Sequence, residues 1–196
     1  MLGNSECFRA DALERAALTL GLKADECFAL AGDAYNAGKT GIGDMAGERG
    51  LELLTEIDRL LISHPLLRLE YWLDFAKSHT GDPVLEQFYL ANARQIISTW
   101  GPPVNDYACR VWSGLIRDFY LERMRKILAA ARGGTNFNSI PWEVEWVESN
   151  QPLSEARPFA DPLQAAVRLV TNAMNEELPV LLHLEDETSG EKFQAQ

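Results

Sequence analysis

Apolar side chains recur at helical spacing along most of this chain, and this periodicity limits its fold more than any other feature. Residues 51–62 are the clearest case, because Leu51, Leu54, Ile57 and Leu61 fall on one side of a helix and charged residues on the other. The same spacing recurs in five further segments, residues 8–37, 66–78, 82–99, 106–132 and 162–174. No longer period repeats, which argues against a solenoid.

Two segments depart from this spacing. Residues 142–147 alternate apolar and charged side chains and fit a strand, although Pro141 favours a short helix at least as strongly. Residues 178–184 form a short apolar run and are the stronger strand candidate. The sequence therefore predicts an all-α fold, an irregular helical bundle of six to eight helices with at most one or two short strands.

Prolines, glycines and capping residues set the expected helix ends. Asp82 and Asp161 each precede a proline, a pair that caps free N–H groups and starts a helix. We expect the longest helix to run from about Asp106 to Arg132. Residues 8–37 are predicted to form one bent helix or two. Residues 38–50 hold five of the 14 glycines and are predicted to be a loop or a loosely helical connection.

Charge and cysteine usage exclude several classes of protein. The chain has 18 basic and 29 acidic residues, a net charge of −11, which disfavours nucleic acid and anionic membranes as partners. No apolar run approaches the ~20 residues of a membrane span. Cys7, Cys27 and Cys109 are widely spaced and the histidines are scattered, so neither forms a metal-binding pattern. We expect no metal and no cofactor.

The chain is predicted to divide into residues 1–175, a helical domain, and residues 176–196, an acidic tail. The tail holds six acids and one lysine, a composition typical of a solvated or poorly ordered extension. Residues 1–5 lack the basic segment and apolar run of a signal peptide.

The loop that begins at Trp100 is the strongest functional signal. Trp100-Gly101-Pro102 joins two helical patterns, and a large aromatic residue beside a backbone break indicates a surface that meets something else. An indole stacks well on the apolar face of a sugar ring. The alternative is an indole buried at the edge of the core. Trp142 and Trp146 fit a sugar platform or an i,i+4 contact within a helix.

A run of motifs around Trp100 resembles the alpha-N-acetylglucosaminidases of glycoside hydrolase family 89. These enzymes carry a run like N-x-R-x-x-x-T-x-W-G-P, then D-Y-A, then W-S-G-L, and then an aromatic pair before an arginine. The matching residues are Asn92, Arg94, Ser98 (in place of Thr), Trp100, Gly101, Pro102, Asp106, Tyr107, Ala108, Trp112, Ser113, Gly114, Leu115, Phe119, Tyr120 and Arg123. In that family the run lies in the C-terminal all-helical domain.

The resemblance implies a role for five residues. Trp100 and Tyr107 are expected to face the substrate cleft, and Asn92, Arg94 and Asp106 to orient the Trp100 loop. Plainer interpretations stay open, because Asp106 fits a helix N-cap, Tyr107 fits a half-buried core residue, and Arg94 fits an ion pair within this domain or a contact with the neighbouring one.

The resemblance also implies that the chain is one part of a larger enzyme. Family members hold their catalytic carboxylates in an upstream (β/α)8 barrel, whose strand-rich pattern is absent here. The chain alone is therefore not expected to be active, and its partners would be that barrel and a glycan ending in N-acetylglucosamine. Family members are lysosomal in animals and periplasmic or secreted in bacteria.

Two other classes of function remain as alternatives. A self-contained helical protein-interaction module would have a complete polar surface. A stand-alone glycosidase would need two carboxyl groups about 5–9.5 Å apart, and no acid here sits in a signature that identifies such a pair. An accessory domain would instead expose an apolar patch with Trp100 at its edge.

Overall fold

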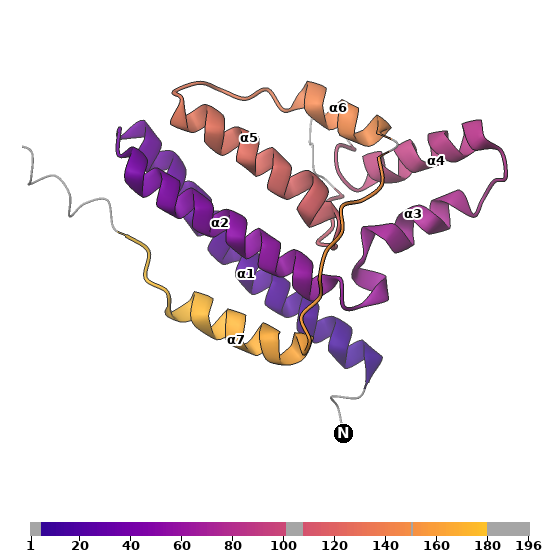
Figure 1. Cartoon of the computed structure of the whole chain (residues 1–196), viewed down its shortest axis with the longest axis horizontal. Helices are drawn as coiled ribbons and strands as arrows, with labels where there is room; N and C mark the ends of the chain where they lie inside the picture. Colours follow the sequence, from indigo (N-terminus) through magenta and orange to yellow (C-terminus); the bar gives the residue numbers. More distant parts are fainter. Residues whose placement is uncertain (1–4, 101–107, 150, 180–196) are drawn as a thin grey trace, which may run out of the picture.

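The computed structural model describes residues 5–100, 108–149 and 151–179, and the regular elements in these ranges are all helices (Figure 1). The elements in order are α1 (Glu6–Asn36), α2 (Thr40–Leu61), η2 (Pro65–Leu67), α3 (Leu69–Lys77), α4 (Pro83–Ile96), η3 (Ile116–Tyr120), α5 (Leu121–Arg132), α6 (Ile140–Glu148) and α7 (Pro162–Asn175). Within the described ranges the only strand-like pairing is an isolated bridge between Arg68 and Ser113. The predicted all-α bundle is confirmed.

α1 and α2 form a long antiparallel pair at the centre of the molecule (Figure 1). α1 is one continuous helix of 31 residues, so Gly21 does not divide it. Ser5 starts it by accepting a hydrogen bond from the Phe8 N–H. Gly38, with a φ of 73°, makes the turn between the two helices, and a glycine adopts that conformation without strain.

Residues 38–50 were predicted to be a loop or a loosely helical connection; the loop alternative is wrong, because the regular helix α2 already begins at Thr40. Three of its glycines, Gly43, Gly47 and Gly50, are buried against neighbouring helices. A Cβ atom at Gly50 would lie 2.8 Å from Cδ1 of Phe28, and one at Gly43 would lie 2.9 Å from Cζ of Tyr35. These glycines therefore serve close helix packing, which outweighs their helix-propensity cost of ~1 kcal/mol each.

The main core lies between α1, α2 and α7, and it includes Leu20, Leu53, Ile57, Leu60 and Leu169. α7 packs along α1, while α5 contacts the α1–α2 pair. Figure 1 shows α7 and α5 on opposite sides of that pair. Across the described residues, no helix combines the length and apolar character needed to cross a membrane.

A second core gathers α3, α4 and α6 around Phe119. Phe119 is fully buried, and its ring centroid lies 5.4 Å from that of Trp142 and 4.6 Å from that of Trp146. Residues 140–148 form helix α6, so the helical alternative for residues 142–147 is correct. The two indoles pack inside the domain, which favours the aromatic contact over the sugar platform.

The helix predicted from Asp106 to Arg132 is shorter where the structure describes it. Residues 109–112 are not helical, and the helix begins only after Gly114, whose φ of 88° breaks the pattern. Its first turn, η3, is a wide π-helical turn that leads into α5. Asp106 lies outside the described residues, as do residues 180–184 of the second strand candidate.

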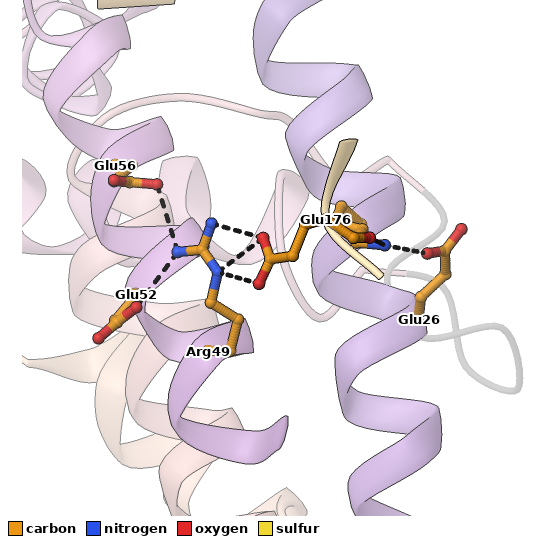
Figure 2. A network of polar contacts seen from close by, with 6 residues as sticks. Glu26, Arg49, Glu52, Glu56 and Glu176 are labelled. Atoms are coloured by element: carbon orange, nitrogen blue, oxygen red, sulfur yellow. Dashed lines mark hydrogen bonds and ion pairs between the residues drawn. The ribbon is translucent and has the colours of Figure 1, made fainter. Parts of the chain in front are cut away.

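Glu176 ties the end of α7 to the central pair (Figure 2). Its carboxylate accepts hydrogen bonds from Arg49 at 2.9 and 3.0 Å, and its carbonyl accepts one from Lys23 at 2.9 Å. Arg49 also contacts Glu52 at 3.2 Å and Glu56 at 3.8 Å. The first residue of the predicted acidic tail is thus held by α1 and α2, and the division at residue 175 stays a prediction.

Candidate functional site

Trp100 emerges just beyond a firmly held helix end. α4 starts at Asp82, which caps the Val84 N–H at 2.8 Å, and it stops at Ile96, before the predicted Thr99. Ser98 is buried, and its hydroxyl donates to the Arg94 carbonyl at 2.7 Å. The Trp72 indole N–H donates to the Ala93 carbonyl at 3.0 Å. Trp100 itself is 48% exposed, so it does not belong to the core.

The side chain of Arg94 points into the domain and binds main-chain carbonyl groups. It is 5% exposed, its Nη1 donates to the Ser149 carbonyl, and its Nη2 donates to the Gln151 carbonyl at 3.3 Å. Its guanidinium also lies 5.5 Å from the Trp146 ring centroid. In the described ranges it pairs with no carboxylate, so the ion pair within this domain, one of the two alternatives left open for Arg94, is not found there. Burial lowers the pKa of Arg94, since desolvation disfavours its charged form.

Of the other predicted site residues, Asn92 is described by the structure and does not lie beside the Arg94 side chain. Asn92 is exposed on α4, and its side chain points away from that of Arg94, as the two-residue spacing requires. Tyr107 and Asp106 lie outside the described residues. The expectations that Tyr107 faces a cleft and that Asn92 and Asp106 orient the loop stay predictions.

Asp58 and Arg117 are important polar residues that the motifs alone did not reveal. Asp58 is 2% exposed and accepts hydrogen bonds from the Gly114 N–H at 2.7 Å and from Arg117 Nη1 at 2.6 Å. A Cβ atom on Gly114 would lie 3.2 Å from Leu69 and 3.3 Å from Leu153. One signal was present, because Asp58 shares the apolar face of α2 with Leu54, Ile57 and Leu61.

An extended segment links these two arginines, and we call residues 149 and 151–155 the strap. Arg94 holds it at Ser149 and Gln151, while Arg117 Nη2 donates to the Ser154 carbonyl. The Ser154 N–H in turn donates to Asp118 at 3.0 Å, and Leu153 packs on the second core. Figure 1 shows this segment in orange, running from the end of α6 towards α7 between α5 and the α3–α4 hairpin.

A surface hollow of about 520 Å³ lies beside the strap, between α3 and α4. Glu70 and Asp74 on α3 and Glu86 on α4 line it together with Arg94 and Gln151. Within the part of the chain that the structure describes, no group of three or more metal-ligating side chains is arranged to hold a metal ion. Leu73, Leu90 and Leu153 also line the hollow, so its wall mixes charged and apolar side chains.

The α3–α4 hairpin exposes many large apolar side chains. Tyr71 and Phe75 on α3 are each 55% exposed, and Phe88 on α4 is 64% exposed. Together with five others they form what we call the hairpin surface: Leu66, Tyr71, Phe75, Val84, Leu85, Phe88, Ile96 and Trp100. The hairpin projects from the central pair (Figure 1), and each of these eight side chains is at least 36% exposed. Such a concentration is typical of a site that another protein or domain covers.

The sequence and the fold are similar to those of glycosidases. Residues 1–172 match the family model described as the alpha-N-acetylglucosaminidase (NAGLU) C-terminal domain. The human alpha-N-acetylglucosaminidase is 34% identical over 86 residues, which are 43% of this chain and 12% of that protein. A family 89 glycoside hydrolase from Clostridium perfringens, in complex with PUGNAc, has a TM-score of 0.76 at 24% identity, covering 88% of this chain and 21% of that one. A variant of that enzyme in complex with its substrate GlcNAc-alpha-1,4-galactose matches with the same TM-score of 0.76.

Proposed function

Because the chain belongs to the family of alpha-N-acetylglucosaminidase C-terminal domains, we propose that it packs on a catalytic barrel and walls the substrate cleft. The proposed substrate is a glycan that ends in alpha-linked N-acetylglucosamine. The matched residues span 12% of the human relative and 21% of the bacterial one, so the proposed role is that of one domain within such an enzyme. The catalytic carboxylates would come from the barrel.

The observation that carries this proposal is Trp100, which is 48% exposed and follows the end of α4 among the exposed residues of the hairpin surface. An interface left bare by a missing neighbour should be apolar, and the hairpin surface has that character. Trp100 follows the end of α4, where Ser98 and Trp72 donate hydrogen bonds to main-chain carbonyls. These bonds hold the backbone that precedes Trp100 in a fixed position. A rigid indole suits stacking on a pyranose, because little conformational entropy is lost when the sugar binds.

The proposed contribution to catalysis is positioning. Trp100 would orient the terminal sugar against the acids of the barrel, which raises the rate by holding the reacting groups in register. Tyr107 belongs to the same proposal as a second cleft residue, with Asn92 and Asp106 as supports for the loop. By its relationship to the family, the whole enzyme would work in a lysosome, in a periplasm or outside the cell.

The test is hydrolysis of an aryl alpha-N-acetylglucosaminide by the chain alone and by the chain fused behind a family 89 barrel that lacks its own helical domain. We expect activity in the fusion only. Trp100→Ala should lower kcat/KM of the fusion about tenfold, which corresponds to ~1.4 kcal/mol of transition-state binding.

Phe8→Ala is the matched control, because Phe8 is an aromatic residue on α1 that is 41% exposed and lies outside the hairpin surface. It should leave kcat/KM unchanged. A fusion that stays inactive with a correctly folded barrel would contradict the proposal and favour a self-contained interaction module. Activity of the chain alone would show that it carries its own carboxylate pair.

A further inference from the structure

The strap is bound through its main chain at two separate points. Arg94 on α4 donates hydrogen bonds to the carbonyls of Ser149 and Gln151, and Arg117 on η3 donates one to the carbonyl of Ser154. A guanidinium has donors in a fixed fork, so it recognises the path of a backbone rather than the identity of a side chain. The two clamps therefore specify where the strap runs.

Burying the guanidinium of Arg94 to hold the strap costs free energy. A buried cation without a carboxylate partner loses much of its solvation, and hydrogen bonds to neutral carbonyls return only part of it. The Trp146 ring, 5.5 Å away, adds a cation–π contact. A buried polar contact of this kind adds little to the free energy of unfolding. Its main effect is to select one path for the strap, as buried polar groups in other proteins select one packing arrangement.

The Arg117 clamp is anchored in turn by Asp58. The carboxylate of Asp58 binds Arg117 at 2.6 Å and the Gly114 N–H at 2.7 Å, so it orients the guanidinium and fixes the start of η3 together. Asp118 completes the clamp by accepting the Ser154 N–H at 3.0 Å. The strap is thus held between a rigid point on α2 and the end region of α4.

The end region of α4 also sets where Trp100 leaves the helix. The Arg94 carbonyl accepts the Ser98 hydroxyl at 2.7 Å, so the residue whose side chain grips the strap also closes the last turn before Trp100. Arg94 therefore connects the strap, which its side chain binds, to the turn before Trp100, which its carbonyl closes, although the strap lies more than 50 residues further along the chain.

We propose that the strap is a positioning element for Trp100, with Arg94 and Arg117 as the two positioning residues that hold it. Its consequence for sugar binding rests on the proposed function, but the mechanical link between the strap and Trp100 does not. The two are therefore tested separately.

The first experiment uses the whole 196-residue chain labelled with 5-fluorotryptophan, which gives one fluorine resonance for each of its five tryptophans. Trp100→Phe identifies the Trp100 resonance. We expect Arg94→Met to shift or broaden that resonance while the circular dichroism spectrum is unchanged. Arg94→Lys, which can still donate to one carbonyl, should give a smaller change in the same direction.

Arg125→Met is the matched control, because Arg125 is a nearby arginine that pairs with Glu122 in exposed positions. It should leave the Trp100 resonance where it is. Asp118→Ala removes the acceptor of the Ser154 N–H and the carboxylate that lies 3.4 Å from Arg117 Nε, so it loosens the strap at Ser154 and provides the test if Arg94→Met fails to fold. An unchanged Trp100 resonance in folded Arg94→Met or Asp118→Ala, or an equal shift in Arg125→Met, would overturn the proposal.

The second experiment measures the fusion enzyme on an aryl alpha-N-acetylglucosaminide. We expect Asp118→Ala to lower kcat/KM several-fold, in the same direction as Trp100→Ala, because the sugar platform is displaced while the barrel acids are intact. A shifted Trp100 resonance with unchanged kcat/KM would contradict the cleft role of Trp100 and leave the strap link standing. An unshifted resonance would contradict the link itself, whatever the kinetics.

Discussion

Asp58 shows how a single charge can fix several parts of the fold. It lies on the buried face of α2, where the neighbouring positions are apolar. Its role there is polar, because one carboxylate oxygen accepts the Gly114 N–H and the other accepts a hydrogen bond from Arg117. A buried carboxylate is tolerated when its lone pairs are satisfied and a cation is adjacent. Removing its charge while keeping its shape should therefore reveal the cost of leaving Arg117 with Asp118, 3.4 Å from its Nε, as its remaining carboxylate partner in the described residues.

We predict that Asp58→Asn lowers the free energy of unfolding by roughly 2–4 kcal/mol, because the amide still accepts the Gly114 N–H but no longer balances the guanidinium. Urea denaturation followed by circular dichroism measures the change. Asp44→Asn is the control, since the Asp44–Arg132 pair is exposed on both sides and should contribute little. An equal decrease in the free energy of unfolding of both variants would show that the burial of Asp58 does not determine its contribution to stability.

Glu56 carries a charge that burial disfavours. Desolvation raises its pKa above the ordinary value of 4.5, and this outweighs the attraction of Arg49, which lies 3.8 Å away. Because the folded-state pKa is higher than the unfolded one, the folded protein binds the proton more tightly. The stability that protonation adds is full below pH 4.5 and is lost as the pH rises through the folded-state value.

We therefore predict that Glu56→Gln stabilises the protein at pH 7 and that this gain shrinks towards zero as the pH falls below about 4.5, where wild-type Glu56 is itself neutral. Thermal unfolding at a series of pH values measures the difference between the two proteins. A gain that grows as the pH falls would show that the Arg49 contact dominates over burial.

At the scale of helices, α2 illustrates how packing can override local propensity. Gly50 lies under Phe28, which packs against both the main core and a smaller one around Ala31. An alanine there improves helix propensity by ~1 kcal/mol but forces the Phe28 ring to move. Overpacking of this kind costs about 1–3 kcal/mol, so the balance should be unfavourable.

We predict that Gly50→Ala destabilises the chain by about 1–2 kcal/mol, whereas Gly41→Ala, with no atom within 4 Å of its added methyl group, leaves stability unchanged or raises it by up to ~1 kcal/mol. Chemical denaturation of the two variants measures both changes. If Gly50→Ala were as stable as Gly41→Ala, the α1–α2 pair would not depend on the small residues between the helices.

The contrast between α2 and α4 explains what could be predicted from sequence. The Asp82-Pro83 start of α4 was correct because capping is local chemistry. The glycines of α2 were misjudged because their purpose depends on Phe28 and Tyr35, which come from another helix. The same holds at the candidate site, where the motif indicated Trp100 and Arg94 but contained no information about the strap that Arg94 binds.

At the scale of the whole molecule, apolar exposure is unevenly distributed. The main core is closed by α1, α2 and α7, whereas the hairpin of α3 and α4 has its second core on one side and the hairpin surface left open. An acidic chain with a net charge of −11 resists nonspecific association through repulsion. The hairpin surface can therefore remain accessible for a specific neighbour, which we propose to be the catalytic barrel.

This arrangement predicts that one substitution on the hairpin blocks assembly while a similar one elsewhere does not. Phe88→Asp places a charge on a side chain that is 64% exposed, and Leu18→Asp does the same on α1 at 62% exposure, so neither should unfold the domain. Buried at an interface, an unpaired carboxylate would cost several kcal/mol. We expect Phe88→Asp to weaken binding to a separately produced family 89 barrel at least a hundredfold by calorimetry, and Leu18→Asp to bind like the wild type. Equal affinities for the two variants would exclude the hairpin as the contact surface, and loss of binding in Leu18→Asp alone would place that surface on α1.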